Sequence, residues 1–166
     1  MNWIPSAVSA LISVTAVMVV YALNRRHDYY ELARSLHEDL TSGQVAGARD
    51  ALGTLVHGPP QPDLDFAPQK IRHAYFTLLW AFERIQAGRH HMARGSVLGG
   101  GKAARRYLDG MIRWHVREWA SGLPMVRERL EDLTGESMTD SDSLQAFEEL
   151  TREFGIRSEA ASVSAI

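Results

Sequence analysis

Residues 3–23 read WIPSAVSALISVTAVMVVYAL, and this stretch of 21 residues contains no charged side chain. A helix rises about 1.5 Å per residue, so the stretch would span roughly 30 Å, the thickness of the hydrocarbon core of a bilayer. A surface helix of this length in a globular protein would show a polar face, and none is visible here. The sequence therefore predicts a single transmembrane helix that contacts the lipid bilayer through residues 3–23.

A cleavable signal peptide is the main alternative for this stretch. Signal peptides carry a basic residue before a shorter apolar segment and end in a small-x-small cleavage site. No Lys or Arg precedes Arg25, and residues 20–23 (VYAL) lack the cleavage pattern. Trp3 and Tyr21 instead lie near the two ends of the stretch, where aromatic rings favour the headgroup region. These features favour an anchor that is retained.

The flanking charges predict the orientation of the anchor. Arg25 and Arg26 follow the apolar stretch, whereas no Lys or Arg precedes it. The positive-inside rule then places the N-terminus outside and the rest of the chain in the cytoplasm. The preference for Arg over Lys, 16 to 2, is typical of a GC-rich bacterial genome. We therefore expect a single-pass protein of the bacterial inner membrane.

The rest of the chain is predicted to be all-α. Its apolar residues recur at helical spacing, as at Leu32, Leu36 and Leu40, and no period-2 run of β-branched residues is convincing. The fold class is thus an N-terminal transmembrane helix followed by a small cytosolic bundle of four to five helices. The expected organisation is an anchor with a basic flank at 1–27, a helical hairpin at 28–57, a Pro-rich linker at 58–67, a central bundle at 68–134, an acidic linker with an amphipathic helix at 135–157, and a disordered tail at 158–166.

Turn signals set the expected helix boundaries in the second half of the chain. A long helix from about 68 to 88 is apolar on most sides, which is typical of a central helix. A loop near 95–101 and a helix at about 102–121 follow. The sequence Gly122-Leu123-Pro124 predicts the end of that helix and the start of a short one reaching about 134. The last helix is expected to begin at a cap, Ser141 or Asp142.

Charge is distributed unevenly along the chain. Residues 67–117 carry a net charge of +8, whereas residues 118–166 carry −7 and residues 24–66 carry −3. One explanation is that the acidic C-terminal segments lie across the basic helices and neutralise them. The other is a basic surface that faces anionic headgroups or a polyanion. The residues expected to contact such a surface are Arg25, Arg26, Arg89, Arg94, Lys102, Arg105 and Arg106.

No catalytic motif is visible in this sequence. Gly95 to Lys102 superficially resembles a phosphate-binding loop, but its spacing is wrong, Ala103 replaces the required Ser or Thr, and no strand precedes it. The seven histidines show no zinc-binding spacing, and His115 on its apolar face is expected to be a core residue bonded to a neighbour. We therefore predict no catalytic residue, cofactor or metal, and a non-enzymatic role. Nucleic acid is disfavoured because the net charge is −2 and no recognised binding fold is visible.

Two charged residues fall within apolar stripes. Arg49 lies beside Val45 and Leu52 on a helical wheel, and Glu83 is the only acid in the apolar helix at 68–88. Charges in such places are costly unless they are paired. We expect an intramolecular ion pair between Arg49 and Glu83 that joins the hairpin to the central helix; a snorkelling Arg49 with an exposed Glu83 is the alternative.

Three short motifs follow the apolar stretch: ARDAL at 48–52, LLWAFERI at 78–85 and MIRWHVREW at 111–119. In this order they resemble a loose family of uncharacterised bacterial single-pass membrane proteins with a small cytosolic helical domain. The resemblance implies this architecture and the Arg49–Glu83 pair, and it brings no catalytic residues.

The predicted function is a membrane-tethered, non-enzymatic interaction or scaffolding protein, whose partner is an unknown cytosolic or membrane protein. The alternative is a module that binds anionic lipid or a polyanion through 67–117. Small residues at 6, 9, 10, 13 and 16 form a stripe that would also suit a homodimer.

Overall fold

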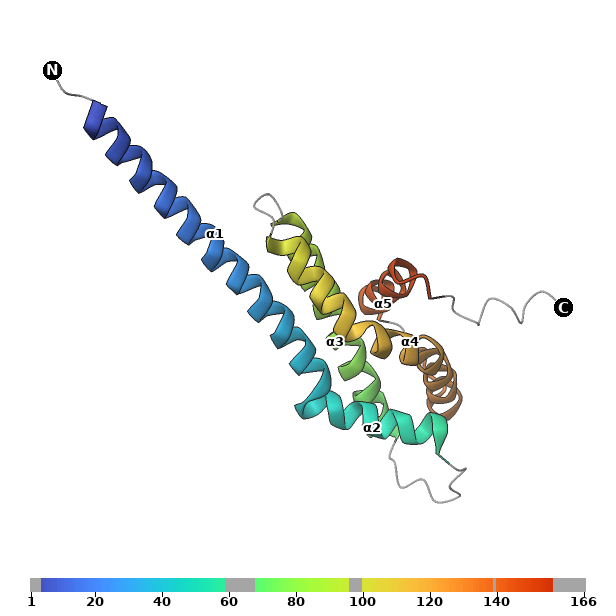
Figure 1. Cartoon of the computed structure of the whole chain (residues 1–166). Helices are drawn as coiled ribbons and strands as arrows, with labels where there is room; N and C mark the ends of the chain where they lie inside the picture. The colour runs from blue at the N-terminus through green and yellow to red at the C-terminus, as the bar shows by residue number, and fades with distance from the viewer. Residues whose placement is uncertain (1–3, 59–67, 96–99, 139, 157–166) are drawn as a thin grey trace.

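Five α-helices make up the described part of this protein, which we analysed as a computed structural model (Figure 1). The structure describes residues 4–58, 68–95, 100–138 and 140–156, with side chains from Leu11 onward. The helices are α1 (Ile4–Thr41), α2 (Gly43–His57), α3 (Pro68–Arg94), α4 (Gly100–Thr134) and α5 (Ser141–Glu153). The all-α prediction is confirmed. Of the predicted linker at 58–67, residues 59–67 lie outside the described residues, as does the predicted tail at 158–166.

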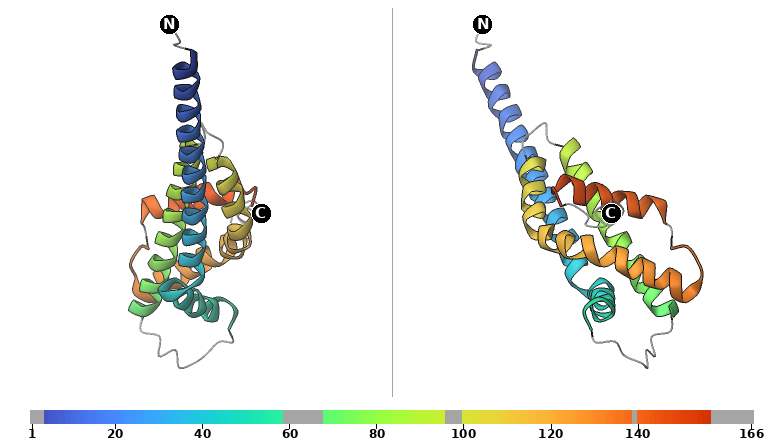
Figure 2. Two further views of the ribbon diagram at one scale, coloured as in Figure 1. Left: turned by 60° about the vertical axis from the view of Figure 1, so that its left-hand side comes forward. Right: turned by 90° about the vertical axis from the view of Figure 1, so that its right-hand side faces the viewer.

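Helix α1 is one unbroken helix that joins the predicted anchor to the first helix of the hairpin. No Pro or Gly occurs between Ser6 and Ser42, so nothing in the sequence interrupts it. Its second half packs on the bundle through side chains such as Ala33 and Leu40, which are fully buried. Its first half extends beyond the other helices (Figures 1 and 2).

The predicted membrane span at 3–23 falls only partly on described residues. Residue 3 is not described, and the side chains of 4–10, which hold most of the small-residue stripe, are not described either. Within the described part of the chain, no helix is long and apolar enough to cross a membrane.

Helix α3 is the central helix, as its sequence predicts. Tyr75, Leu78, Leu79 and Phe82 are fully buried, and α3 contacts each of the other four helices. The helix extends beyond the expected end at Gly88 as far as Arg94, because Gly88 does not act as a helix terminator here. A side chain at this position would collide with Leu36 of α1, so the glycine permits a close helix–helix approach.

Helix α4 runs without a break through Pro124, so the predicted end of the helix near residue 121 is wrong. Proline removes one helical hydrogen bond, yet packing can hold a helix together across it. Leu123 and Val126, on either side of Pro124, are buried in the core. The helix changes direction along its length instead of ending (Figure 2).

Helix α5 closes the bundle against α3. Its cap is Asp140, which accepts a hydrogen bond from the backbone N–H of Ser143 at 3.4 Å, so the predicted caps Ser141 and Asp142 are wrong. Trp80 of α3 donates from Nε1 to the other oxygen of Asp140 at 3.0 Å. This contact lowers the pKa of Asp140 below its usual range, and the hydrogen bonds from Ser143 act in the same direction. Buried side chains from all five helices form one core.

Candidate functional site

The end of the bundle from which the free half of α1 extends is built by three helices. The start of α4 lies against α1. This is seen at Gly100, where an added side chain would contact the backbone of Arg26. The rings of Tyr30 on α1 and Tyr107 on α4 are 5.6 Å apart. The end of α3 joins them, with the ring of His91 lying 5.9 Å from that of Tyr29. This end of the bundle therefore adjoins the apolar stretch of α1.

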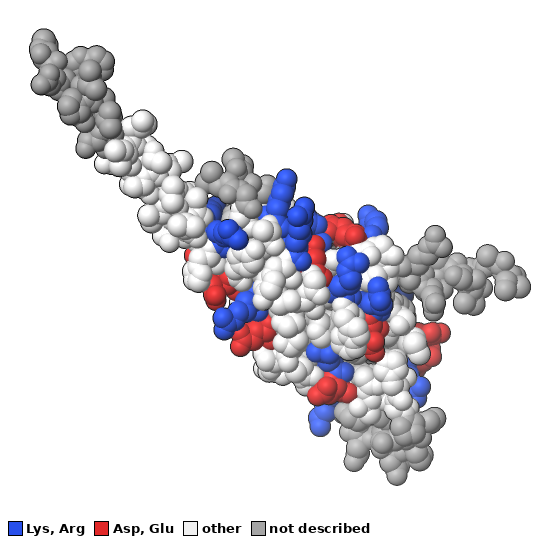
Figure 3. Space-filling model, viewed as in Figure 1, with Lys and Arg blue, Asp and Glu red and all other residues white. Residues whose placement is uncertain are grey.

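Exposed basic side chains lie at this end of the bundle. Figure 3 shows Lys and Arg gathered where the white, apolar half of α1 leaves the other helices. Within the described part of the chain, none of these side chains forms an ion pair, although the guanidinium groups of Arg25 and Arg26 lie over the rings of Tyr29 and Tyr30. We call this group the basic collar; it consists of Arg25, Arg26, Arg94, Lys102 and Arg106.

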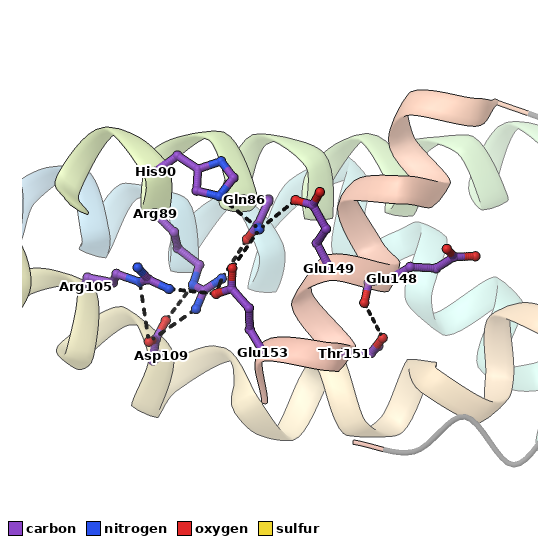
Figure 4. Close-up of polar contacts among 9 residues, drawn as sticks. All are labelled: Gln86, Arg89, His90, Arg105, Asp109, Glu148, Glu149, Thr151 and Glu153. Carbon is purple, nitrogen blue, oxygen red and sulfur yellow. Dashed lines mark hydrogen bonds and ion pairs between the residues drawn. The ribbon is translucent and has the colours of Figure 1, made fainter. Parts of the chain in front are cut away.

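Two other residues predicted to contact an anionic surface form ion pairs within the protein instead. Arg89 is only 1% exposed, so its assignment to the surface is wrong. Its Nε donates to Asp109 at 2.7 Å, and its Nη1 lies 2.8 Å from an oxygen of Glu153 (Figure 4). Arg105 is partly exposed, but its Nη2 donates to the same Glu153 oxygen at 2.7 Å. Neither guanidinium is available to a lipid.

These four residues and Gln86 form a neutral cluster that joins α3, α4 and α5. Arg89 Nη1 also donates to Gln86 Oε1 at 2.6 Å. Burial alone would raise the pKa of Glu153, but the charges of Arg89 and Arg105 and the hydrogen bonds from Arg89 and Gln86 outweigh it and lower this pKa. We call this group the α5 clasp; it consists of Gln86, Arg89, Arg105, Asp109 and Glu153.

The predicted neutralisation by acidic segments is therefore partial. Glu153 of α5 pairs with two arginines, and Glu136 pairs with Arg72 at 2.9 Å. The basic collar has no acidic partner among the described residues. Of the two explanations for the charge distribution, the first holds for the clasp and the second stays open for the collar.

The predicted ion pair between Arg49 and Glu83 is wrong. Arg49 Nη1 donates to the carbonyl oxygen of Leu40 at 3.5 Å, where the last carbonyls of α1 lack helical donors. Glu83 accepts a hydrogen bond of 2.6 Å from the hydroxyl of Ser143 on α5. Both side chains do need partners, as predicted, but the packing of the helices supplies different ones.

A group of buried polar atoms lies where α1, α2 and α4 meet. Arg49 Nε, His115 Nδ1 and Trp119 Nε1 are buried and have no hydrogen-bond partner among the described residues, so the predicted bond from His115 to a neighbour is not found at Nδ1. Burial, together with smaller effects of the charges of Arg49 and His37, lowers the pKa of His115 from 6.5 to about 4. His115 is therefore neutral at pH 7.

We expect His115 to make the fold less stable in acid. Its folded pKa lies below its unfolded pKa, so the unfolded chain binds the proton more tightly and stability falls as the pH drops from about 6.5 to about 4. Because the ring is only partly buried, we expect about 1–2 kcal/mol from this group. Urea unfolding at several pH values should show this loss, and His115→Gln should remove it. His27→Gln, which changes an exposed histidine, is the control; equal pH profiles for the two variants would contradict the prediction.

Several cavities open on the described surface. One, of about 310 Å³, is lined by Lys102 and Arg106 of the basic collar and by Arg105 and Asp109 of the α5 clasp. Two further cavities lie away from the collar. One, of about 270 Å³, is lined by Leu123, Phe147 and Tyr75, and burial raises the pKa of Tyr75 to about 12. At neutral pH this hydroxyl keeps its proton. The other, of about 440 Å³, is a groove between α2 and α4. No group of three or more potential metal ligands occurs among the described residues.

Sequence reasoning missed the partners of Arg89. Phe82, Ile85 and Arg89 follow one another at helical spacing on the buried side of α3, and this spacing could have placed Arg89 in the core. Nothing in the sequence could have identified Asp109 and Glu153 as its partners, because they lie on other helices. Comparison of the chain with protein families, with curated proteins and with solved structures finds no match.

Proposed function

We propose that this protein is a membrane-tethered helical module that serves as an interaction or scaffolding protein in the inner membrane of a bacterium. The apolar first half of α1 would be the anchor, the bundle would lie on the cytoplasmic side, and the basic collar would face the headgroups. One observation carries the proposal: the exposed apolar half of α1 leaves the bundle at the end that the basic collar surrounds.

The apolar side chains of this half have no packing partner in the bundle. Leu11, Val14 and Val17 are each more than 60% exposed, and similar exposure continues to Leu23. These positions lie on several sides of the helix, so one neighbouring surface could not cover them all. Exposed apolar surface of this extent marks a membrane or protein interface. A bilayer would cover every side of the helix at once.

The collar supports the same arrangement. Basic residues near an anionic leaflet each contribute about 1 kcal/mol of attraction, which falls off within a Debye length. Arg25 and Arg26 follow the apolar stretch directly, and the fold brings Arg94, Lys102 and Arg106 to the same level. Five cations would thus meet the headgroups on the cytoplasmic side, as the positive-inside rule requires.

Extraction of bacterial membranes that contain the full chain tests the anchor. We expect the protein to stay in the membrane fraction in high salt and in alkaline carbonate, and to leave it only in detergent. When fused to the C-terminus, a reporter enzyme that works only in the cytoplasm should be active, and one that works only in the periplasm should be inactive. Release by salt or carbonate would contradict the anchor, and a periplasmic reporter signal would contradict the orientation.

Recognition of anionic lipid is the second candidate function, because the collar cations form no ion pair with any described residue. Hydrogen exchange of the full chain in nanodiscs should slow at the start of α4 when phosphatidylglycerol replaces phosphatidylcholine. Changing Arg94, Lys102 and Arg106 together to Ser should remove this difference. Equal exchange rates of the unchanged chain in the two lipids would contradict recognition of anionic lipid, but would not contradict the proposed membrane anchor.

A further inference from the structure

The outer side of α4 carries two parallel rows of exposed side chains. Arginines at positions 106, 113 and 117 form one row, and Tyr107 and Trp114 form the next. Seven residues make nearly two helical turns, so residues seven apart lie on the same side of the helix and each row runs along its axis. Two such residues are about 10 Å apart along the axis. Both rows face away from the core, because the opposite side of α4 carries the buried Leu108 and Ile112.

Large aromatic side chains are unusually accessible here. Tyr107 is 47% exposed and Trp114 is 58% exposed. Gly110 lies between them on the same exposed side, and a side chain added at this position would meet nothing within 4 Å. A second backbone could therefore approach α4 closely between the rings. We call this surface the α4 ridge; it consists of Arg106, Tyr107, Gly110, Arg113, Trp114 and Arg117.

The charges of the α4 ridge are not compensated within the described part of the chain. Arg106 and Arg117 form no ion pair there, and the guanidinium of Arg113 lies over the ring of Phe154, 5.1 Å from its centre. The only acid between 102 and 117 is Asp109, which is bound to Arg89 in the α5 clasp. An anionic partner would therefore meet three cations along this stretch; the next acid in the helix, Glu118, lies 3.4 Å from His57 of α2.

The membrane proposed above cannot serve as this partner along the whole ridge. Helix α4 starts at the collar and continues along the bundle away from the free half of α1 (Figures 1 and 2). Arg117 lies 15 residues beyond Lys102, which is about 22 Å along a helix and more than two Debye lengths at physiological salt. Headgroups at the collar would leave Arg113 and Arg117 without a partner.

The composition of the ridge favours a protein. Trp, Tyr and Arg are the residues that dominate binding energy at protein interfaces, whereas a simple polyanion would leave the two rings in water. Rings spaced by seven residues match the apolar positions of a second helix laid alongside, and the neighbouring arginine row would match its acidic positions. The negative net charge of the whole chain, −2, argues against a nucleic acid.

We propose that the α4 ridge binds an acidic amphipathic helix of a partner protein. The Asp or Glu row of that helix pairs with Arg113 and Arg117 and, where no headgroup occupies it, with Arg106, which the ridge shares with the basic collar. Its apolar row covers Tyr107 and Trp114. This inference names the partner chemistry of the interaction module and rests on that proposed role, but it does not depend on the membrane anchor. Failure of the anchor appears in membrane extraction, whereas failure of the ridge appears in a binding titration.

Fluorescence anisotropy with three labelled helical peptides tests the ridge on the full chain in a neutral detergent. Each peptide has about 20 residues, enough for a stable helix. The first carries a Glu row beside a Leu row, the second has Lys in place of Glu, and the third has Gln in place of Leu. We expect the first peptide to bind about tenfold more tightly than the other two, because each of them lacks one of the two rows.

Variants of the chain locate the binding surface. Arg106→Ser with Arg117→Ser should weaken binding of the first peptide about tenfold, and Trp114→Ser should weaken it about fivefold. The matched controls are Lys70→Ser with Arg129→Ser, which remove two exposed cations elsewhere, and Met125→Ser, which removes an equally exposed apolar side chain. The controls should bind as the unchanged chain does.

Four outcomes of the binding experiments would overturn the proposal. They are no binding of the first peptide, equal binding of the third, equal losses in ridge and control variants, and tighter binding of a labelled oligothymidine that competes with the peptide. Sedimentation should also show that Trp114→Ser leaves the oligomeric state unchanged. Loss of a dimer in that variant would identify a second copy of this chain as the occupant and would likewise overturn the proposal.

Discussion

Arg89→Met is expected to lower the free energy of unfolding by about 3–5 kcal/mol. The change removes the buried cation of the α5 clasp and leaves Asp109 and Glu153 facing each other, with only Arg105 to pair them. The two carboxylates are only partly buried, with side chains 23% and 35% exposed, but with one cation between them one must either stay charged at a cost or take up a proton. Because Glu153 lies at the end of α5, we expect α5 to detach before the rest of the bundle unfolds.

Chemical denaturation of the full chain measures this loss, and limited proteolysis shows whether α5 is released first. Arg105→Met is the control, since Arg105 is more exposed and should cost no more than about 1 kcal/mol. Combining Arg89→Met with Asp109→Leu and Glu153→Leu should recover most of the stability, because the charges leave together. A loss below 1 kcal/mol for Arg89→Met, or no recovery in the triple variant, would show that the clasp does not hold α5.

Gly101→Ala is expected to cost about 2–3 kcal/mol, although alanine is the better helix former. Gly101 is buried in the first turn of α4, and a side chain there would collide with the carbonyl oxygen of Met92 on α3. The obstacle is backbone and not a flexible side chain, so it can yield only if one helix moves. That movement would also disturb the basic collar, which the start of α4 helps to form.

Gly110→Ala in the same helix is the matched control. Gly110 is exposed and has nothing within 4 Å of an added side chain, so the change should stabilise the helix by about 0.5–1 kcal/mol. The melting temperature should therefore fall in the Gly101→Ala variant and rise in the Gly110→Ala variant. Equal melting temperatures would mean that α3 and α4 do not approach each other as closely as the structure shows.

The sequence by itself determined the class of fold and its central helix. Apolar side chains repeat at helical spacing throughout, and those of the helix at 68–88 cover most of its sides, so it had to be surrounded by others. The continuous apolar stretch before Arg25 could also be recognised directly, because length and lack of charge are local properties. Helix ends were less predictable, since packing on both sides of Pro124 holds α4 together where local rules end it.

The tertiary structure decided which charged residues meet. Arg49, Glu83 and Arg89 all lie on buried helix faces, but only the packing of α4 and α5 against α3 gives Arg89 its carboxylates, and only that of α5 gives Glu83 its hydroxyl. The collar likewise exists only because the end of α3 lies beside Tyr29 and the start of α4 lies beside Arg26. A helical wheel shows which face of one helix is buried, but the partner of a buried charge depends on distances between helices, which the order of residues does not contain.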